Sequence, residues 1–396
     1  MFVTEIDEMQ VITVELKNEV NYLAFFLSWS QSVSVIDIFF KSTANNDNNH
    51  LMLTLTGRDS NLRQHLKKLV INGYRPTVSL VDNKTSYYPE RNPKLDRLCS
   101  LTLTAPKISR ELISEVLILL AEAKFSLVEY NYLSKGENSQ KCLVVRILMR
   151  GELTDLENFK IQLSTLSHKF SVDMFYQKEI KDMKDFSLLV MDMDSTLINF
   201  EVIDELAREA NVLDEVSAIT ESAMRGDINF KQSLMKRLNL LANTDIKVLD
   251  RVFDRIRLNP GAERLISTLK NSHYKIAIIS GGFSFFADRI KENLDIDYAF
   301  ANVLETKDGL LTGKLTGKLI DGEAKAAIVK KLSDKHDIKE EKVISIGDGA
   351  NDIPMLKVSG LGIAFRAKLL LSKNADCVIT QGGLDSVLYF FGWRDI

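Results

Sequence analysis

The sequence predicts an α/β protein whose second half is an open parallel sheet, preceded by two smaller α+β domains. From residue 186 onward, short apolar strands alternate with longer helical patterns, which is typical of parallel sheets with helical crossovers. Before that point, the order strand-helix-strand-strand-helix-strand occurs twice, with a period of roughly 90 residues. Two polar stretches, residues 82–97 and 177–186, separate the three parts.

Composition and charge are those of an ordinary globular protein. The 396 residues are 45% hydrophobic and 27% charged, which is enough apolar material for two or three domain cores. The net charge of −3 gives no electrostatic reason to expect nucleic acid or an anionic membrane as a partner. The N-terminus lacks the pattern of a signal peptide, and no apolar run is long enough to span a membrane. Because the three cysteines are also scattered, we expect a cytoplasmic protein.

The first domain is expected over residues 1–90. Its predicted strands and helices follow the βαββαβ order of small α+β domains. The strands are expected at residues 9–16, 32–40, 51–57 and 75–81, and the helices at residues 18–29 and 60–72.

The second domain, residues 97–180, follows the same order more clearly. A strand at 98–105 leads into a helix at 109–123, whose apolar residues recur on one side. Strands at 125–134 and 141–151 come next, then a helix beginning at Thr154, and a last strand at 168–177. Thr154 and Glu157 have the spacing of a capping box. We expect a four-stranded antiparallel sheet covered by two helices.

Both copies resemble ACT domains, small regulatory modules that often pair across a dimer and bind amino acids. The resemblance rests on element order and, in the second copy, on the stretch from Ser100 to Ser134. ACT domains that bind amino acids usually carry Asp and Gly in the loop between the first strand and the first helix. Here that loop reads APKIS. We therefore expect these domains to serve as the scaffold of a homodimer.

The third domain, residues 186–396, is expected to contain five parallel strands. They are predicted at residues 187–192, 274–280, 342–347, 360–365 and 376–380. An insertion at 200–258, between the first two strands, is helical by pattern. A helical insertion directly after a strand end that carries polar side chains is where an active-site lid would lie.

Polar side chains follow three of these strands and should meet, because open parallel sheets build their sites at the carboxyl ends of their strands. The candidates are Asp192, Asp194, Ser280, Gly281, Asp348, Asn351 and Asp352, with Lys325 on a predicted helix between the second and third strands. Carboxylate oxygens are ligands suited to Mg²⁺. The ion and the lysine would supply the positive charge that buried carboxylates require. An ionised aspartate beside a metal can attack phosphorus.

The order D-x-D-x-T, S-G-G, Lys, G-D-G-x-N-D resembles the haloacid dehalogenase superfamily of phosphohydrolases over residues 186–390. The resemblance implies a Rossmann-like sheet with a helical cap at 200–258. It implies that Asp192 is the nucleophile and that Asp194 is the acid and base. It also implies that the side chains of Asp192 and Asp348 and the backbone carbonyl of Asp194 hold Mg²⁺.

The same resemblance implies roles for the remaining motif residues. Ser280, Gly281 and Lys325 would hold the phosphoryl group, and Asn351 would contact it or the substrate. Asp352 would orient Lys325 or the water shell of the metal.

The insertion suggests the substrate. Glu201 lies at the start of a predicted lid helix, and Phe230 and Arg237 lie two helical turns apart, on one face of another. An arginine can bind a carboxylate through two hydrogen bonds and a glutamate can accept from an ammonium group, so this pair suits a zwitterionic phospho-amino acid. The lid and the runs SGGF, DYAFAN and GDGANDI resemble those superfamily members that hydrolyse O-phospho-L-serine, the last step of serine biosynthesis.

Two alternatives stay open. The phosphoryl group could pass from Asp192 to another small alcohol such as homoserine, because water and an alcohol would enter the same pocket. The protein could instead be an amino-acid sensor with an inactive phosphatase domain. Residues 309–318, GLLTGKLTGK, have a P-loop spacing that is one residue short, so we expect a β-hairpin or a strand and turn there.

Overall fold

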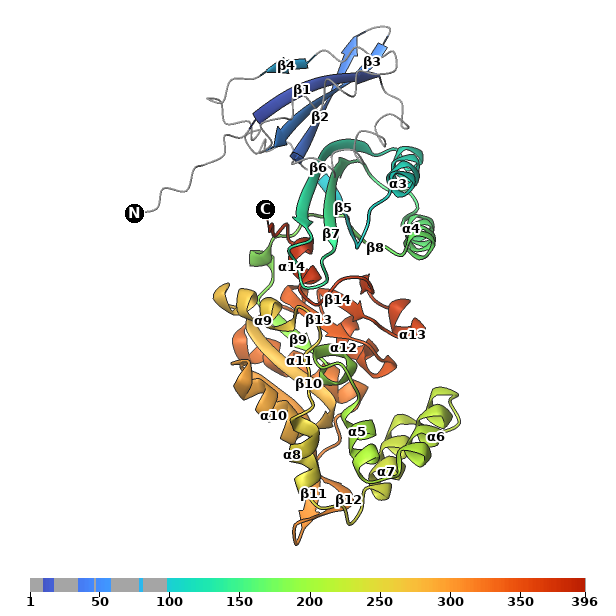
Figure 1. The fold of residues 1–396 in the computed structure, drawn as a ribbon, viewed down its shortest axis with the longest axis vertical. Coiled ribbons are helices and arrows are strands. Elements are labelled where there is room, and N and C mark those ends of the chain that lie inside the picture. The colour runs from blue at the N-terminus through green and yellow to red at the C-terminus, as the bar shows by residue number, and fades with distance from the viewer. Residues whose placement is uncertain (1–9, 18–34, 46–47, 58–77, 81–97, 396) are drawn as a thin grey trace, which may run out of the picture. The chain divides into compact units, whose positions relative to one another are not determined.

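The computed structural model describes residues 10–17, 35–45, 48–57, 78–80 and 98–395 (Figure 1). The chain divides into two units, each described here by itself. The first comprises Met1–Lys181 together with Leu388–Ile396, and the second comprises Asp182–Val387. None of the helices in the described ranges is both long and apolar enough to cross a membrane.

The first unit contains an eight-stranded sheet. Its strands are β1 (Gln10–Lys17), β2 (Val35–Asn45), β3 (Asn48–Gly57), β4 (Val78–Leu80), β5 (Leu98–Ala105), β6 (Ser126–Lys135), β7 (Leu143–Arg150) and β8 (Asp173–Gln177). The strand order is β4-β1-β3-β2-β6-β7-β5-β8, and every neighbouring pair is antiparallel. Read outward from the β2–β6 pair, the two halves have the same strand order, as expected of an internal repeat.

The two helices predicted in residues 1–90 lie outside the described residues, and the ACT-like assignment stays a prediction. In the second half of the first unit, helix α3 (Arg110–Glu122) begins where Ser109 accepts a hydrogen bond from the Leu112 amide at 3.1 Å. The apolar side of this helix packs into a core with the alternate residues of β5, such as Leu101 and Leu103. The predicted order βαββαβ is therefore present in residues 98–177.

The predicted start of the next helix is wrong. Helix α4 (Leu156–Phe170) is capped by Asp155, not by Thr154, because the Asp155 carboxylate accepts from the Asn158 amide at 3.0 Å. A carboxylate one residue further along the chain thus satisfies the amide that the predicted capping box would have used.

The C-terminal segment belongs to the first unit, although the sequence suggests one catalytic domain up to residue 396. This segment includes the end of helix α14 (Ser386–Phe390), whose Tyr389 is buried against Leu133 and Val144. The ring of Phe390 lies 4.3 Å from that of Phe175, centroid to centroid. The end of the chain therefore packs apolar side chains against residues of β6, β7 and β8.

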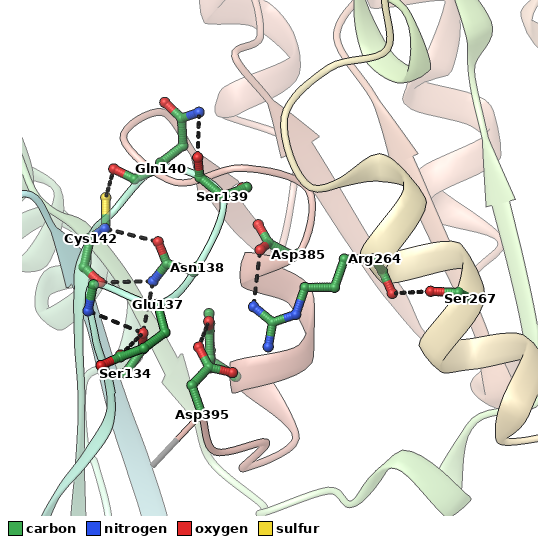
Figure 2. A network of polar contacts seen from close by, with 12 residues as sticks. Ser134, Glu137, Asn138, Ser139, Gln140, Cys142, Arg264, Ser267, Asp385 and Asp395 are labelled. Carbon is green, nitrogen blue, oxygen red and sulfur yellow. Dashed lines mark hydrogen bonds and ion pairs between the residues drawn. The ribbon is translucent and has the colours of Figure 1, made fainter.

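The loop between β6 and β7 is fixed by its own side chains (Figure 2). The Asn138 amide donates to the Cys142 carbonyl at 2.7 Å and accepts from the Cys142 N–H at 2.8 Å. It also donates to the Ser134 hydroxyl at 3.2 Å. Asn138 therefore closes the loop in the way a backbone turn would.

The second unit is built on a seven-stranded sheet with the order β12-β11-β10-β9-β13-β14-β15. The five predicted strands are present and parallel: β9 (Leu188–Met191), β10 (Lys275–Phe283), β13 (Val343–Gly347), β14 (Leu361–Phe365) and β15 (Cys377–Ile379). Two further strands extend one edge: β11 (Tyr298–Lys307) is parallel to β10, and β12 (Leu310–Thr316) is antiparallel to β11. Of the two expectations for residues 309–318, the strand and turn is confirmed, because this stretch holds only β12, which forms a hairpin with the preceding β11.

Crossover helices pack on this sheet, as expected of a Rossmann-like fold. They are α9 (Ala262–Asn271), α10 (Ser284–Asn293), α11 (Gly322–His336), α12 (Ile353–Lys357) and α13 (Leu369–Ser372). All four residues of the central strand β9 are fully buried. Leu188 and Val190 share a core with Val329 and Leu332 of α11, which holds the carboxyl end of β9 in a fixed place.

The predicted lid is a helical insertion between β9 and β10 (Figure 1). Its helices are α5 (Val202–Glu209), α6 (Leu213–Met224), α7 (Phe230–Leu240) and α8 (Lys247–Phe253). The two chain segments that enter and leave the lid pair with each other through a bridge between Ile198 and Leu258. The Asn199 N–H also donates to the Arg257 carbonyl at 3.1 Å. This paired stem fixes where the lid leaves the sheet.

Candidate active site

The site begins where β9 ends. Asp192 is only 4% exposed, and its N–H donates to the Ile346 carbonyl of β13 at 3.0 Å. The next residues, Met193–Leu197, form a tight turn in which Ser195 has a φ of 57°. This turn brings Asp194 back over the strand end, next to Asp192.

A buried lysine balances the carboxylate charge at the strand end. Lys325 of α11 is fully buried, and its ammonium lies 2.6 Å from an oxygen of Asp192 and 2.6 Å from one of Asp352. Burial alone would lower the pKa of Lys325, but the two carboxylates outweigh it and raise that pKa above its usual value. Lys325 therefore stays charged and forms a buried ion pair with Asp192.

Asp352 supports this arrangement without facing the cavity. One of its oxygens binds Lys325, and the other accepts from the N–H groups of Asp348 at 3.2 Å and Gly349 at 3.0 Å. A Cβ at Gly347 would lie 2.4 Å from the Asp352 carboxyl carbon, so only glycine permits this approach. Asp352 thus orients Lys325 and the loop that carries Asp348.

Three carboxylates offer oxygens within 4.8 Å of one another: those of Asp192, Asp348 and Asp352. Asp192 and Asp348 line the cavity, whereas Asp352 does not, so Asp192 and Asp348 are the side chains placed to bind a cation there. Burial raises the pKa of Asp348 to about 8, and the charges of Asp192 and Asp352 add to the effect. Buried, mutually repelling carboxylates with hard oxygen donors fit a divalent cation such as Mg²⁺.

Asp194 lies in a different environment from Asp192. Burial raises the pKa of Asp194 well above its usual range, and the charges of Glu201 and Asp192 raise it further. One of its oxygens accepts from the Val202 N–H at 3.0 Å. The two neighbouring aspartates are therefore differentiated: Asp192 is paired with Lys325, whereas Asp194 is suited to carry a proton.

The end of β10 supplies small groups next to these acids. Ser280 is fully buried, and its hydroxyl accepts from the Gly282 N–H at 2.9 Å. A Cβ at Gly282 would lie 2.3 Å from Asp194, so a side chain there would displace the acid. The Gly281 carbonyl accepts from the Asn302 amide at 2.9 Å, which fixes the direction of the peptide plane.

A cavity of about 280 Å³ joins the strand ends to the lid. Nine predicted site residues line it: Asp192, Asp194, Glu201, Phe230, Arg237, Ser280, Gly281, Asp348 and Asn351. Lys325 and Asp352 do not line the cavity, and they lie behind Asp192 instead. The motifs that are far apart in the sequence therefore meet in one place.

The lid contributes both predicted charged residues, Glu201 and Arg237, to the cavity. The Glu201 carboxylate accepts from the Ser195 hydroxyl at 2.8 Å. The Arg237 Nε is buried and has no hydrogen-bond partner among the residues that the structure describes. A buried donor without a partner is costly, so the cavity offers Arg237 as a site for an acceptor.

The sequence did not single out several residues of the site. Asp204, Thr220 and Lys368 also line the cavity. Asn259 lies at the lid stem, where its amide donates to the carbonyls of Ser195 at 3.2 Å, Thr196 at 2.8 Å and Ile198 at 3.0 Å. Its side chain therefore holds the turn that carries Asp194. No motif marks such a residue, because its role depends on backbone groups.

Comparisons with known proteins agree with this architecture. Residues 189–357 match the model of the haloacid dehalogenase-like hydrolase family. The phosphoserine phosphatase of Archaeoglobus fulgidus is 46% identical over 237 residues, which cover 59% of this chain and 69% of that protein.

Solved structures give the same result. The unliganded probable phosphoserine phosphatase from Vibrio cholerae is 30% identical with a TM-score of 0.60, covering 74% of this chain and 86% of that one. A structure described as a phospho-aspartyl intermediate analogue of phosphoserine phosphatase is 45% identical with a TM-score of 0.50, covering 53% of this chain and 99% of that one.

The parallel sheet, the helical lid and the acids at the strand ends define a hydrolase of the haloacid dehalogenase type. The similarity over most of the length of named relatives shows that this chain belongs to the haloacid dehalogenase-like hydrolase family. Within that family it is a phosphatase, as predicted from the motifs. The alternative of a sensor with an inactive phosphatase domain is therefore not supported.

Replacing Asn259 with Ala should weaken both the fold and the activity. Three carbonyls, two of them in buried contacts, would lose a donor, so we expect a loss of about 1–3 kcal/mol in the free energy of unfolding. Because Asp194 would shift with its turn, kcat should fall by about 10- to 100-fold. Denaturant unfolding and initial rates measure both effects. Asn374→Ala is the matched control, since the Asn374 amide donates at 2.9 Å to the Leu370 carbonyl in an exposed position. Equal behaviour of the two variants would contradict the assigned role.

Proposed function

We propose that the protein hydrolyses O-phospho-L-serine to L-serine and phosphate. The observation that carries this proposal is the placement of Glu201 and Arg237 in the same cavity as Asp192 and Asp194. A guanidinium suits the substrate carboxylate and a carboxylate suits its ammonium group, while the strand ends receive the phosphate ester. The named relatives, which are phosphoserine phosphatases, support the same substrate.

The proposed reaction has two displacements. An oxygen of Asp192 attacks phosphorus, and the serine oxygen leaves with the proton of Asp194. Asp194 then takes a proton from the water that hydrolyses the aspartyl phosphate, which regenerates Asp192 and releases phosphate. The ion pair between Asp192 and Lys325 and the raised pKa of Asp194 support these opposite roles. The phospho-aspartyl analogue described for a relative supports the same intermediate.

The phosphoryl group needs positive charge and hydrogen-bond donors around it. We expect the Ser280 hydroxyl and the Gly281 backbone to face the phosphoryl oxygens, with Lys325 behind them and Asn351 at the cavity wall. Asp192, Asp348 and the Asp194 carbonyl would hold Mg²⁺, which when bound offsets negative charge at the reacting group. A chelator should then abolish phosphate release, and added Mg²⁺ should restore it.

We propose that the enzyme acts in the cytoplasm. Hydrolysis of phosphoserine would be the final step of serine biosynthesis, in the cytoplasm. The three cysteines, Cys99, Cys142 and Cys377, are buried and form no disulfide with one another, which is compatible with a reducing compartment. We also propose that the protein forms a homodimer through its N-terminal domains. Size-exclusion chromatography with light scattering tests this assembly directly.

The function is tested by phosphate release from O-phospho-L-serine beside a panel of other phosphomonoesters. Rapid release that prefers phosphoserine supports the proposal, whereas activity only on other esters would contradict the substrate. Adding homoserine tests the alternative acceptor. The appearance of O-phosphohomoserine would show transfer to an alcohol in place of hydrolysis.

Changes at Arg237 and Glu201 should separate the two ends of the substrate. Arg237→Lys keeps the charge but loses the planar pair of donors, so KM for phosphoserine should rise about 10- to 100-fold. O-phosphoethanolamine lacks the carboxylate and should be hydrolysed by this variant as by wild type. Glu201→Gln should weaken the binding of phosphoserine. It should not weaken the binding of 3-phosphoglycerate, which has a hydroxyl in place of the ammonium group. If both esters respond equally to each change, the assignments are wrong.

A further inference from the structure

The hairpin formed by β11 and β12 is joined to the lid by backbone hydrogen bonds. The Asn243 N–H donates to the Leu311 carbonyl and the Leu311 N–H to the Thr244 carbonyl, each at 2.8 Å. The Ile246 N–H donates to the Gly309 carbonyl at 3.0 Å. These residues follow α7 directly, so the hairpin fixes the C-terminal end of that helix.

One glycine makes the contact with α7 itself. Gly313 has a φ of 77°, and a Cβ there would lie 3.0 Å from the Leu238 carbonyl oxygen and 3.1 Å from the Asn239 Cα. The same Cβ would lie 3.1 Å from the Ala242 side chain. Two of these three neighbours are backbone atoms, which a side chain cannot push aside without moving the helix. The backbone of β12 therefore approaches the last turn of α7 as closely as it does only because residue 313 has no side chain.

Arg237 is the cavity-lining residue of α7 that lies beside this contact. It lies next to Leu238 in the sequence, and its Nε is buried with no hydrogen-bond partner in the described part of the chain. Among the described residues, no hydrogen bond at Nε holds the guanidinium in place, so a shift of the helix would carry it away from its position near Glu201 and Asp204. The other end of α7 carries Phe230, whose ring lies 3.2 Å from the Cβ position of Gly281.

We propose that the β11–β12 hairpin is a docking platform for α7 and that Gly313 is the positioning residue that sets Arg237 over the substrate carboxylate. This inference rests on the proposed function for the identity of that carboxylate. The docking itself does not depend on it. Gly313 does not contact the reacting atoms, and its effect should therefore appear in substrate selection rather than in the chemical step.

The chain offers a matched control for the test. Gly309 and Gly317 have φ values of 79° and 80°, close to that of Gly313, but a Cβ at either meets nothing within 4 Å. Gly313→Ala and Gly317→Ala thus share the backbone strain of an alanine in the left-handed region, and they differ in the contact with α7.

We expect Gly313→Ala to raise KM for O-phospho-L-serine by about tenfold relative to Gly317→Ala, because Arg237 is displaced. The two variants should hydrolyse O-phosphoethanolamine, which has no carboxylate, at rates within about twofold of each other. The double variant Gly313→Ala/Ala242→Gly removes the clash with the Ala242 side chain, so its KM should lie between those of Gly313→Ala and wild type. If Gly313→Ala folds poorly, this double variant is compared with Gly317→Ala in its place. Equal substrate profiles for the two alanine variants would overturn the role assigned to Gly313.

Hydrogen exchange provides a second readout that needs no substrate. The amides of Phe230–Leu240 should exchange about tenfold faster in Gly313→Ala than in Gly317→Ala, because the docked helix is loosened. Equal exchange would overturn the docking platform. If wild type does not hydrolyse phosphoserine at all, the proposed function fails, whereas the exchange experiment still decides the docking.

Discussion

Replacing Asp192 with Asn should abolish turnover, lowering kcat by about 10⁴-fold or more. The carboxamide has nearly the same shape but is a poor nucleophile, so the first displacement cannot occur. The fold should persist, because Lys325 keeps its second partner, Asp352, at 2.6 Å. Circular dichroism and initial-rate measurements on the purified variant test both statements.

Asp194→Asn is the informative comparison for this variant. It removes the proton donor but leaves the nucleophile, so it should retain more activity toward esters whose alcohols leave readily without a proton. Asp192→Asn should be inactive on all esters alike. Appreciable turnover by Asp192→Asn, on any ester, would contradict its role as nucleophile.

Replacing Lys325 with Met should have the largest effect on stability. The change would leave Asp192 and Asp352, which are 4% and 0% exposed, without their cation. Removing one partner from a buried ion pair costs about 3–5 kcal/mol, because the remaining charge is uncompensated. Activity should fall as well, since Asp192 would lose the buried cation with which it is paired. Denaturant unfolding of the second unit, Asp182–Val387, within the full-length protein measures the loss of stability.

Lys275→Met provides the control. Lys275 pairs with Asp297 at 2.9 Å, but its side chain is 43% exposed, so the solvent screens the interaction. Its loss should change the free energy of unfolding by less than about 1 kcal/mol. If Lys325→Met proved as stable as Lys275→Met, the buried ion pairs would not be what stabilises the strand end.

The parts of the fold that were predicted are those with a strong local signal. The five parallel strands appear as continuous apolar runs because they are buried on both faces, and polar residues follow them at the carboxyl edge. β11 was missed because it is only partly buried along most of its length and lacks such a run. The helix start at Thr154 was wrong because Asp155, one residue further on, provides an equally good cap.

The residues of the site also differ in whether a sequence pattern reveals them. Residues that act through their own charge, such as Asp192, Lys325 and Arg237, lie in motifs that can be recognised. Asn259 and Asn302 act by holding backbone carbonyls of distant segments, and no sequence pattern records which carbonyls come near them. Gly313 lies in a stretch predicted to be a β-hairpin or a strand and turn, but its approach to α7 depends on the tertiary fold.

The most direct test of the proposed mechanism is to trap the phosphorylated enzyme. The protein is mixed with O-phospho-L-serine and Mg²⁺, quenched in acid during turnover and analysed by peptide mass spectrometry. We predict one phosphoryl group on Asp192, and none when the chelator is present or when Asp192 is replaced by Asn. Steady release of phosphate with no phosphorylated Asp192, or with the phosphoryl group on another residue, would contradict the proposed mechanism.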